Sequence, residues 1–172
     1  MPDKKYIAIV DDHAMFRKGL RTLINIFPNY EVLLDASNGQ DFIAQLNSKR
    51  LPDIVLMDIT MPEMDGYTTT AWLLDKYPDI KVLALSTMDS ETAIIKMIKS
   101  GARGYVLKDA EPDELNTAFD EVIHRGYYYN ELITSKVLTA VRKIIEDRNS
   151  VATFVKLTDR EIEFLKYFCT EM

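Results

Sequence analysis

The sequence contains a single cysteine, Cys169, among its 172 residues, and only two histidines, His13 and His124. One cysteine cannot form an internal disulfide, and the cysteine and histidine spacings of zinc-binding motifs do not occur. These absences exclude a disulfide-stapled scaffold and a zinc finger. A sequence without paired cysteines fits a reducing compartment, so we expect a cytoplasmic protein.

Long apolar runs and excess positive charge are also missing. No stretch approaches the roughly 20 uncharged apolar residues of a membrane-spanning helix, and residues 1–5 lead into an apolar segment without a signal-peptide pattern. We therefore expect no membrane association. With 21 Lys and Arg against 27 Asp and Glu, the net charge is −6. An acidic chain does not favour nucleic-acid binding, so any DNA contact would need a local basic patch or a further segment.

The sequence is rich in apolar residues, at 47%, and these alternate between strand-like and helix-like patterns. Short apolar runs bounded by turn residues predict buried parallel strands at residues 6–10, 31–36, 54–58, 81–86 and 104–107. Apolar residues at helical spacing predict helices around 16–27, 40–47, 66–76, 90–100 and 112–125. This alternation predicts the α/β class, as a doubly wound (βα)5 domain with a five-stranded parallel sheet.

The alternation ends at Gly126. Residues 132–145 have the pattern of another amphipathic helix, and Thr158 with Glu161 has the spacing of a capping box that opens a further helix. We therefore expect a domain at residues 1–126, a helical linker at 127–156, and the start of a second domain at 157–172.

Polar residues follow four of the predicted strands at their carboxyl ends. Asp11 and Asp12 follow the first strand, Asp58 ends the third, Ser86 ends the fourth and Lys108 follows the fifth. In an open α/β sheet this edge is where ligands bind, so we expect these groups to converge.

Three converging carboxylates repel one another unless a cation neutralises them, and Mg²⁺ prefers such oxygen ligands. An aspartate nucleophile, a metal, a lysine and a hydroxyl together indicate phosphoryl transfer. Taken singly, each residue has a plainer interpretation. Asp11 and Asp12 could cap the first helix, Ser86 could bond to backbone, and Tyr105 could be a core residue. His13 beside them is better explained as a solvated residue at the helix start than as a ligand.

Together the motifs resemble the receiver domain of two-component response regulators over residues 5–125. They are Asp11-Asp12, Asp58 with residues 61–66 (MPEMDG), Ser86, and residues 101–108 (GARGYVLK). This resemblance implies the flavodoxin-like receiver fold. Residues 157–163 (LTDREIE) resemble the opening of the LuxR-type helix-turn-helix domain of the NarL/FixJ subfamily. The later helices of that domain, including the one that would read DNA, do not follow in this sequence, so we expect DNA binding only through a full-length output domain.

The resemblance also implies a role for each matching residue. Asp58 corresponds to the phosphoacceptor. The Mg²⁺ ligands correspond to Asp11, Asp12, Asp58 and the backbone carbonyl of Thr60. Lys108 and Ser86 correspond to the groups that contact the phosphoryl oxygens, and Ser86 with Tyr105 to the conformational switch. The implied partners are a sensor histidine kinase and, after phosphorylation, a second copy of the chain.

The implied function is a phosphorylation-controlled transcription regulator and not an enzyme, with no organic cofactor. A phosphatase of the haloacid dehalogenase type is disfavoured, because the second acid that such enzymes carry two residues after the nucleophile is Thr60 here. A receiver-like module that works without phosphorylation stays open, although none of the acids or the lysine is lost.

Overall fold

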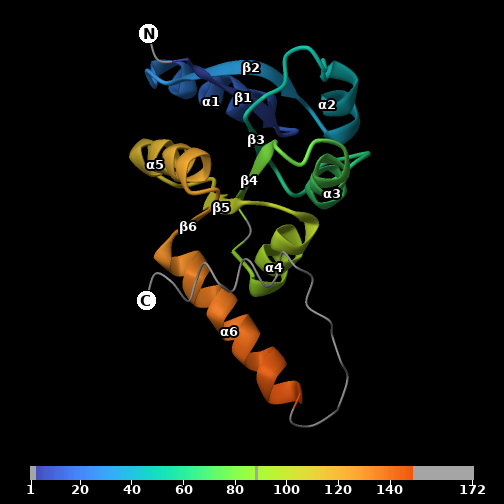
Figure 1. The fold of residues 1–172 in the computed structure, drawn as a ribbon, viewed down its shortest axis with the longest axis vertical. Coiled ribbons are helices and arrows are strands. Elements are labelled where there is room, and N and C mark those ends of the chain that lie inside the picture. Colours follow the sequence, from blue (N-terminus) through green and yellow to red (C-terminus); the bar gives the residue numbers. More distant parts are fainter. Residues whose placement is uncertain (1–2, 88, 149–172) are drawn as a thin grey trace. The chain divides into compact units, whose positions relative to one another are not determined.

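The computed structural model describes residues 3–87 and 89–148, and the strands of this region form one parallel sheet (Figure 1). The six strands of this region are β1 (Lys5–Val10), β2 (Tyr30–Ala36), β3 (Ile54–Met57), β4 (Lys81–Ser86), β5 (Gly104–Leu107) and β6 (Tyr128–Tyr129). They lie in the order β2-β1-β3-β4-β5-β6, with every pair parallel. The strand order reverses between β1 and β3, which is the switch point where such sheets bind ligands.

Helices cover both faces of the sheet, as the doubly wound prediction requires. They are α1 (Ala14–Ile26), α2 (Gly39–Gln45), α3 (Gly66–Lys76), α4 (Glu91–Ser100) and α5 (Pro112–His124). A further helix, α6 (Glu131–Arg148), follows β6 in the chain. Helices α1 and α5 lie on one face, and α2, α3 and α4 lie on the other (Figure 1). The predicted fold class is therefore confirmed, and the helix bounds agree with the apolar spacing to within a few residues.

The sheet has one strand more than the five predicted. Strand β6 is only two residues long, too short to leave a recognisable apolar run. It pairs with β5 through Gly104 and Tyr105, opposite Tyr128 and Tyr129. A Cβ on Gly104 would lie 2.7 Å from the Tyr128 carbonyl oxygen, so a glycine is needed for this approach.

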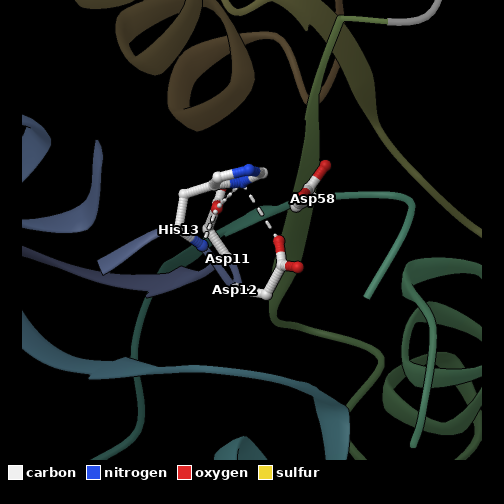
Figure 2. A group of neighbouring side chains, drawn as sticks. All are labelled: Asp11, Asp12, His13 and Asp58. Atoms are coloured by element: carbon white, nitrogen blue, oxygen red, sulfur yellow. Dashed lines mark hydrogen bonds and ion pairs between the residues drawn. The ribbon is translucent and has the colours of Figure 1, made fainter. Parts of the chain in front are cut away.

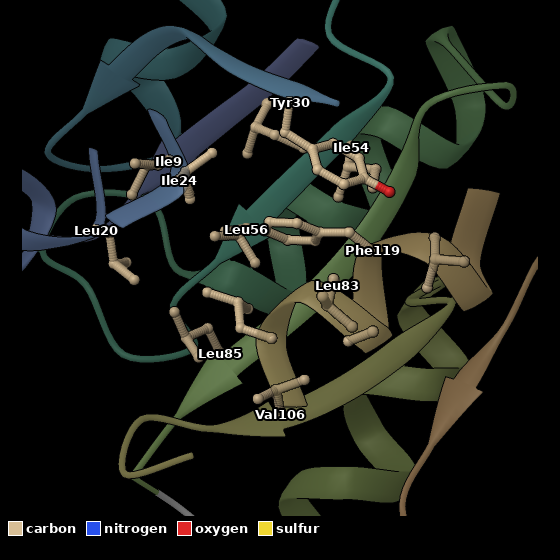
Figure 3. Packing of buried hydrophobic residues seen from close by; sticks show 14 of the residues in the cluster. Ile9, Leu20, Ile24, Tyr30, Ile54, Leu56, Leu83, Leu85, Val106 and Phe119 are labelled. Atoms are coloured by element: carbon tan, nitrogen blue, oxygen red, sulfur yellow. The ribbon is translucent and has the colours of Figure 1, made fainter. Parts of the chain in front are cut away.

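The main apolar core lies between the sheet and the α1–α5 layer. Alternate strand residues such as Ile9, Leu56 and Val106 point into it (Figure 3). Phe119 of α5 packs in the centre, with its ring centroid 5.0 Å from that of Tyr30. Successive strand residues point to opposite faces of a sheet. Ser86 and Tyr105 are adjacent in sequence to the core residues Leu85 and Val106, so they point toward the α2–α4 layer instead.

Helix α6 begins at a side-chain cap, since the Asn130 side chain accepts a hydrogen bond of 2.9 Å from the Ile133 amide. The chain divides into two compact units, Met1–Val137 and Leu138–Met172, and the division falls within α6. The predicted capping box at Thr158 and Glu161 lies outside the described residues, so the domain bounds at 126 and 156 stay predictions. Among the described residues, no helix combines the length and apolar character needed to cross a membrane.

Candidate functional site

Asp11 and Asp58 lie together at the carboxyl edge of the sheet. They directly follow β1 and β3, whose last residues, Val10 and Met57, are register partners. The amide of Asp58 also donates to the Val10 carbonyl at 2.8 Å. Both residues are buried, with 2% of Asp11 and 6% of Asp58 exposed. Burying two carboxylates side by side is unfavourable unless a cation offsets their charge, so the site has the character of a cation-binding centre (Figure 2).

Lys108 supplies a positive charge to both carboxylates. It follows β5, and its amide donates to the Ser86 carbonyl at 3.0 Å. Its Nζ lies 2.6 Å from Asp11 Oδ2 and 3.1 Å from Asp58 Oδ2. Burial acts to lower the pKa of Lys108, but the two carboxylates outweigh it and the pKa is raised. The lysine is therefore charged at neutral pH.

Asp58 experiences opposing effects. Burial and the neighbouring charge of Asp11 raise the pKa of its carboxyl above the usual value, although Lys108 and the Ile59 amide act to lower it. Its Oδ1 accepts a hydrogen bond of 2.8 Å from that amide, and Oδ2 faces Lys108. The charged form of Asp58 is thus held by two donors in a place where desolvation disfavours it, as expected of a reactive carboxylate.

The loop after Asp58 fixes its position. The Gly66 amide donates to the Ile59 carbonyl at 2.8 Å, and the Asp65 side chain caps α3 by accepting from the Thr68 amide. A Cβ on Gly66 would lie only 2.1 Å from the Asp58 carbonyl oxygen. Gly66 therefore allows the first turn of α3 to pack directly on the backbone of Asp58.

Asp12 and His13 lie at the exposed side of the cluster. The Nδ1 atom of His13 lies 3.1 Å from Asp12 Oδ1 and 3.3 Å from Asp11 Oδ1 (Figure 2). The His13 side chain is 71% exposed, which agrees with the expected solvated histidine at the start of α1.

One ligand atom from each of Asp11, Asp12, His13 and Asp58 can be chosen so that all lie within 4.8 Å of one another. The donors are mainly carboxylate oxygens, which suits a hard divalent ion such as Mg²⁺ better than a soft metal. Thr60, two residues after Asp58, is exposed, and the role of its carbonyl as a ligand stays a prediction.

Ser86 and Tyr105 are joined on the α2–α4 side of the sheet. Ser86 is 2% exposed and Tyr105 is fully buried. Burial raises the pKa of Tyr105 to about 12, although a hydrogen bond with the Ser86 side chain acts to lower it. Tyr105 is thus turned inward and bonded to the residue that was expected to move with it.

Sequence reasoning did not find two residues that support the acidic cluster, Arg17 and Asp35. Arg17 of α1 donates from Nη1 to the Asp11 carbonyl at 2.5 Å and from Nε to Asp35 Oδ2 at 3.2 Å. A sequence pattern that could have indicated this contact is the pair Arg17 and Arg21, four residues apart on one helix, followed by Asp35 near the end of the next strand.

Residues 7–120 match the family model of the response regulator receiver domain. The chain is 34% identical over 164 residues to the transcriptional regulatory protein DegU of Brevibacillus brevis, covering 95% of this chain and 68% of that protein. It is also 34% identical over 163 residues to the nitrate/nitrite response regulator NarL of Escherichia coli K12, covering 93% and 73%.

A crystal structure of a LuxR-family two-component response regulator from Aurantimonas has a similar fold. The TM-score is 0.73 at 28% identity, covering 81% of this chain and 99% of that one. The chain is therefore similar to response regulators both in sequence and in fold.

Proposed function

The chain belongs to the response regulator receiver family, and on that premise we propose that Asp58 accepts a phosphoryl group from a phosphohistidine of a sensor histidine kinase. Its full-length relatives are transcription regulators of the NarL and DegU type. The observation that carries the proposal is the position of Lys108 Nζ, within 3.1 Å of both Asp11 and Asp58. A cation placed there can contact oxygens of a phosphoryl group on Asp58.

In the proposed transfer, a carboxylate oxygen of Asp58 forms a bond to phosphorus. The bond between phosphorus and the histidine nitrogen of the donor breaks, and the electron pair of that bond stays with the imidazole. Lys108 loses its contact with Asp58 Oδ2 and contacts a phosphoryl oxygen instead. Ser86, at the end of the neighbouring strand β4, contributes a hydroxyl donor. Such positioning and neutralisation of oxygens provide most of the catalysis in phosphoryl transfer.

Receiver domains bind Mg²⁺ at an acidic pocket, and the carboxylates here suit that ion. We assign Asp11, Asp12, Asp58 and the Thr60 carbonyl as its ligands. When bound, Mg²⁺ would neutralise charge on the phosphoryl oxygens. The role of the chain's own residues is to hold these ligands at one point and to keep Asp58 ionised.

Tyr105 and Ser86 are the proposed switch. A phosphoryl group that draws the Ser86 hydroxyl toward it competes with the bond between Ser86 and Tyr105. That competition would change the surface near α4, where Ile95 and Ile98 are only half-buried. Pairing of two phosphorylated copies is the proposed consequence, and transcription control is the proposed output. Turnover of a phosphate substrate is not proposed, because no acid stands at Thr60.

Mass spectrometry tests the proposal. The full chain is incubated with acetyl phosphate and MgCl₂, beside Asp58→Asn and the exposed control Asp75→Asn. We expect a phosphate-sized mass gain in the parent and in Asp75→Asn, and none in Asp58→Asn. Adding EDTA before acetyl phosphate should prevent the mass gain. A parent that gains no mass with acetyl phosphate or with a phosphorylated kinase would support the phosphorylation-independent module instead.

A further inference from the structure

Arg17 connects the acidic cluster to the neighbouring strand β2. It lies in the first turn of α1, and its side chain is only 16% exposed. One end of its guanidinium donates to the backbone carbonyl of Asp11 at 2.5 Å, and Nε donates to Asp35 Oδ2 at 3.2 Å. A guanidinium can make both bonds at once because its donors are arranged in a rigid planar fork.

Asp35 holds this guanidinium in place. It lies near the end of β2, paired in register with Ile9 of β1. Its second oxygen accepts a hydrogen bond of 2.5 Å from Arg21, one turn further along α1. Burial acts to raise the pKa of Asp35, but the hydrogen bonds and charges of Arg21 and Arg17 outweigh it and lower that pKa. Asp35 is therefore ionised and fixed by two arginines, and Arg17 also contacts the acidic cluster through the Asp11 carbonyl.

The hydrogen bond from Arg17 is one of several contacts that hold the backbone at Asp11 and Asp12, two of the proposed metal ligands. The Asp11 amide donates to the Ala36 carbonyl at 3.0 Å, and Asp11 Oδ1 accepts from the His13 amide at 2.8 Å. Arg17 holds the Asp11 carbonyl, which belongs to the peptide unit joining Asp11 to Asp12. The orientation of that unit decides whether the Asp12 side chain faces Asp58, so a loss of the Arg17 contact allows the two ligands to separate.

We propose that Arg17, held by Asp35, is a positioning residue for the metal site, which keeps the Asp11–Asp12 peptide in the orientation that directs both carboxylates toward Asp58. This inference rests on the proposed function, because it concerns the same site. Groups that orient metal ligands without touching the metal commonly have large effects on its affinity.

The sign of the effect separates positioning from simple electrostatics. A positive charge near a cation site repels the cation, so removing Arg17 would tighten Mg²⁺ binding if charge alone mattered. Loss of positioning weakens binding instead. The variant Arg17→Lys keeps the charge, but a single ammonium lacks the fork that joins Asp35 to the Asp11 carbonyl.

The test is a titration of the full-length chain with MgCl₂, followed by amide chemical shifts in nuclear magnetic resonance. We expect Arg17→Gln and Arg17→Lys to raise the Kd for Mg²⁺ by about tenfold. The matched control is Arg21→Gln, which also removes a contact with Asp35 but does not touch Asp11. Its Kd is expected to stay within about twofold of the parent value, while its Tm falls about as much as that of Arg17→Gln.

A kinetic measurement gives a second readout. In Arg17→Gln, phosphorylation by acetyl phosphate should need about tenfold more Mg²⁺ for its half-maximal rate, with a maximal rate near that of the parent. A Kd in Arg17→Gln or Arg17→Lys that equals the parent value or falls below it overturns the positioning role, while a parent that binds Mg²⁺ and is phosphorylated on Asp58 leaves the proposed function intact. A parent that binds no Mg²⁺ overturns both.

Discussion

The ammonium of Lys108 lies closer to Asp11 than to Asp58, at 2.6 Å from one carboxylate and 3.1 Å from the other. One partly buried cation is thus shared between a proposed metal ligand and the proposed nucleophile. Asp11 would keep its partner if Asp58 became an acyl phosphate, because the two contacts use different carboxylates. This arrangement lets Lys108 change partners at Asp58 without leaving the site.

Replacing Lys108 should have opposite effects on metal binding and on phosphorylation. In Lys108→Gln, the ammonium no longer competes with Mg²⁺ for the carboxylates, so we expect the Kd for Mg²⁺ to fall. The rate of phosphorylation by acetyl phosphate should fall about a hundredfold, because one charged donor to the phosphoryl oxygens is lost. Lys18→Gln, on the exposed side of α1, should change neither quantity. A Lys108→Gln variant that is phosphorylated at the parent rate would contradict the role of Lys108.

Gly66 should tolerate no side chain. In Gly66→Ala, the new Cβ would lie 2.1 Å from the Asp58 carbonyl oxygen and 2.9 Å from the Ile59 Cα, so the backbone must shift. We expect a loss of about 1–3 kcal/mol in the free energy of unfolding, as for overpacked cores, together with slower phosphorylation of Asp58. The control is Gly19→Ala in α1, where nothing lies within 4 Å of the new Cβ. That variant should gain roughly 0.5–1 kcal/mol, and urea denaturation measures both. Equal stability of the two variants would argue against the close packing of α3 on Asp58.

Most of the fold could be predicted because buried parallel strands leave a strong pattern in the sequence. The run from Ile54 to Met57 is apolar throughout, and its structure as β3 follows from that pattern. Strand β6 could not be found this way. Its two residues pair with β5 because Gly104 admits the Tyr128 carbonyl, and such long-range backbone contacts have no local periodicity.

The candidate site could be predicted where its residues directly follow strands, as Asp11, Asp58 and Lys108 do. The topology alone brings these positions together. Arg17 and Asp35 could not be predicted, because their contact with the cluster depends on the path of α1 and on long side chains. The inward orientation of the Tyr105 side chain could not be predicted either, because the sequence does not distinguish an inward from an outward rotamer.

Ser86 and Tyr105 should be energetically coupled. Tyr105→Phe keeps the buried ring but removes the hydroxyl that bonds to Ser86, and Ser86→Ala removes the other partner. We expect each single variant to lose about 1 kcal/mol in the free energy of unfolding. The double variant should lose less than the sum of the two, by roughly 0.5–1 kcal/mol, because the shared bond is lost only once. Strictly additive losses in denaturant unfolding would show that the hydroxyls do not stabilise one another.

The stability that Asp35 contributes should depend on pH in a defined direction. Its pKa is lowered from 3.8 in the folded protein by Arg21 and Arg17, which outweigh the effect of burial. A folded-state pKa below the unfolded one means that its contribution is fully present above pH 3.8 and is lost as the pH falls through the folded-state pKa. Asp35→Asn should therefore have a lower Tm than the parent at pH 7, and the difference should shrink when both are measured below the unfolded-state pKa. For a chain of this size, each kcal/mol in the free energy of unfolding corresponds to a shift of roughly 2–4 °C in Tm.

The exposed acid Asp75 provides the control for this pH dependence, since Asp75→Asn should leave the Tm nearly unchanged at both pH values. A Tm difference between Asp35→Asn and the parent that stays constant from pH 7 to acid would mean that packing, and not the charge of Asp35, holds Arg17 in place.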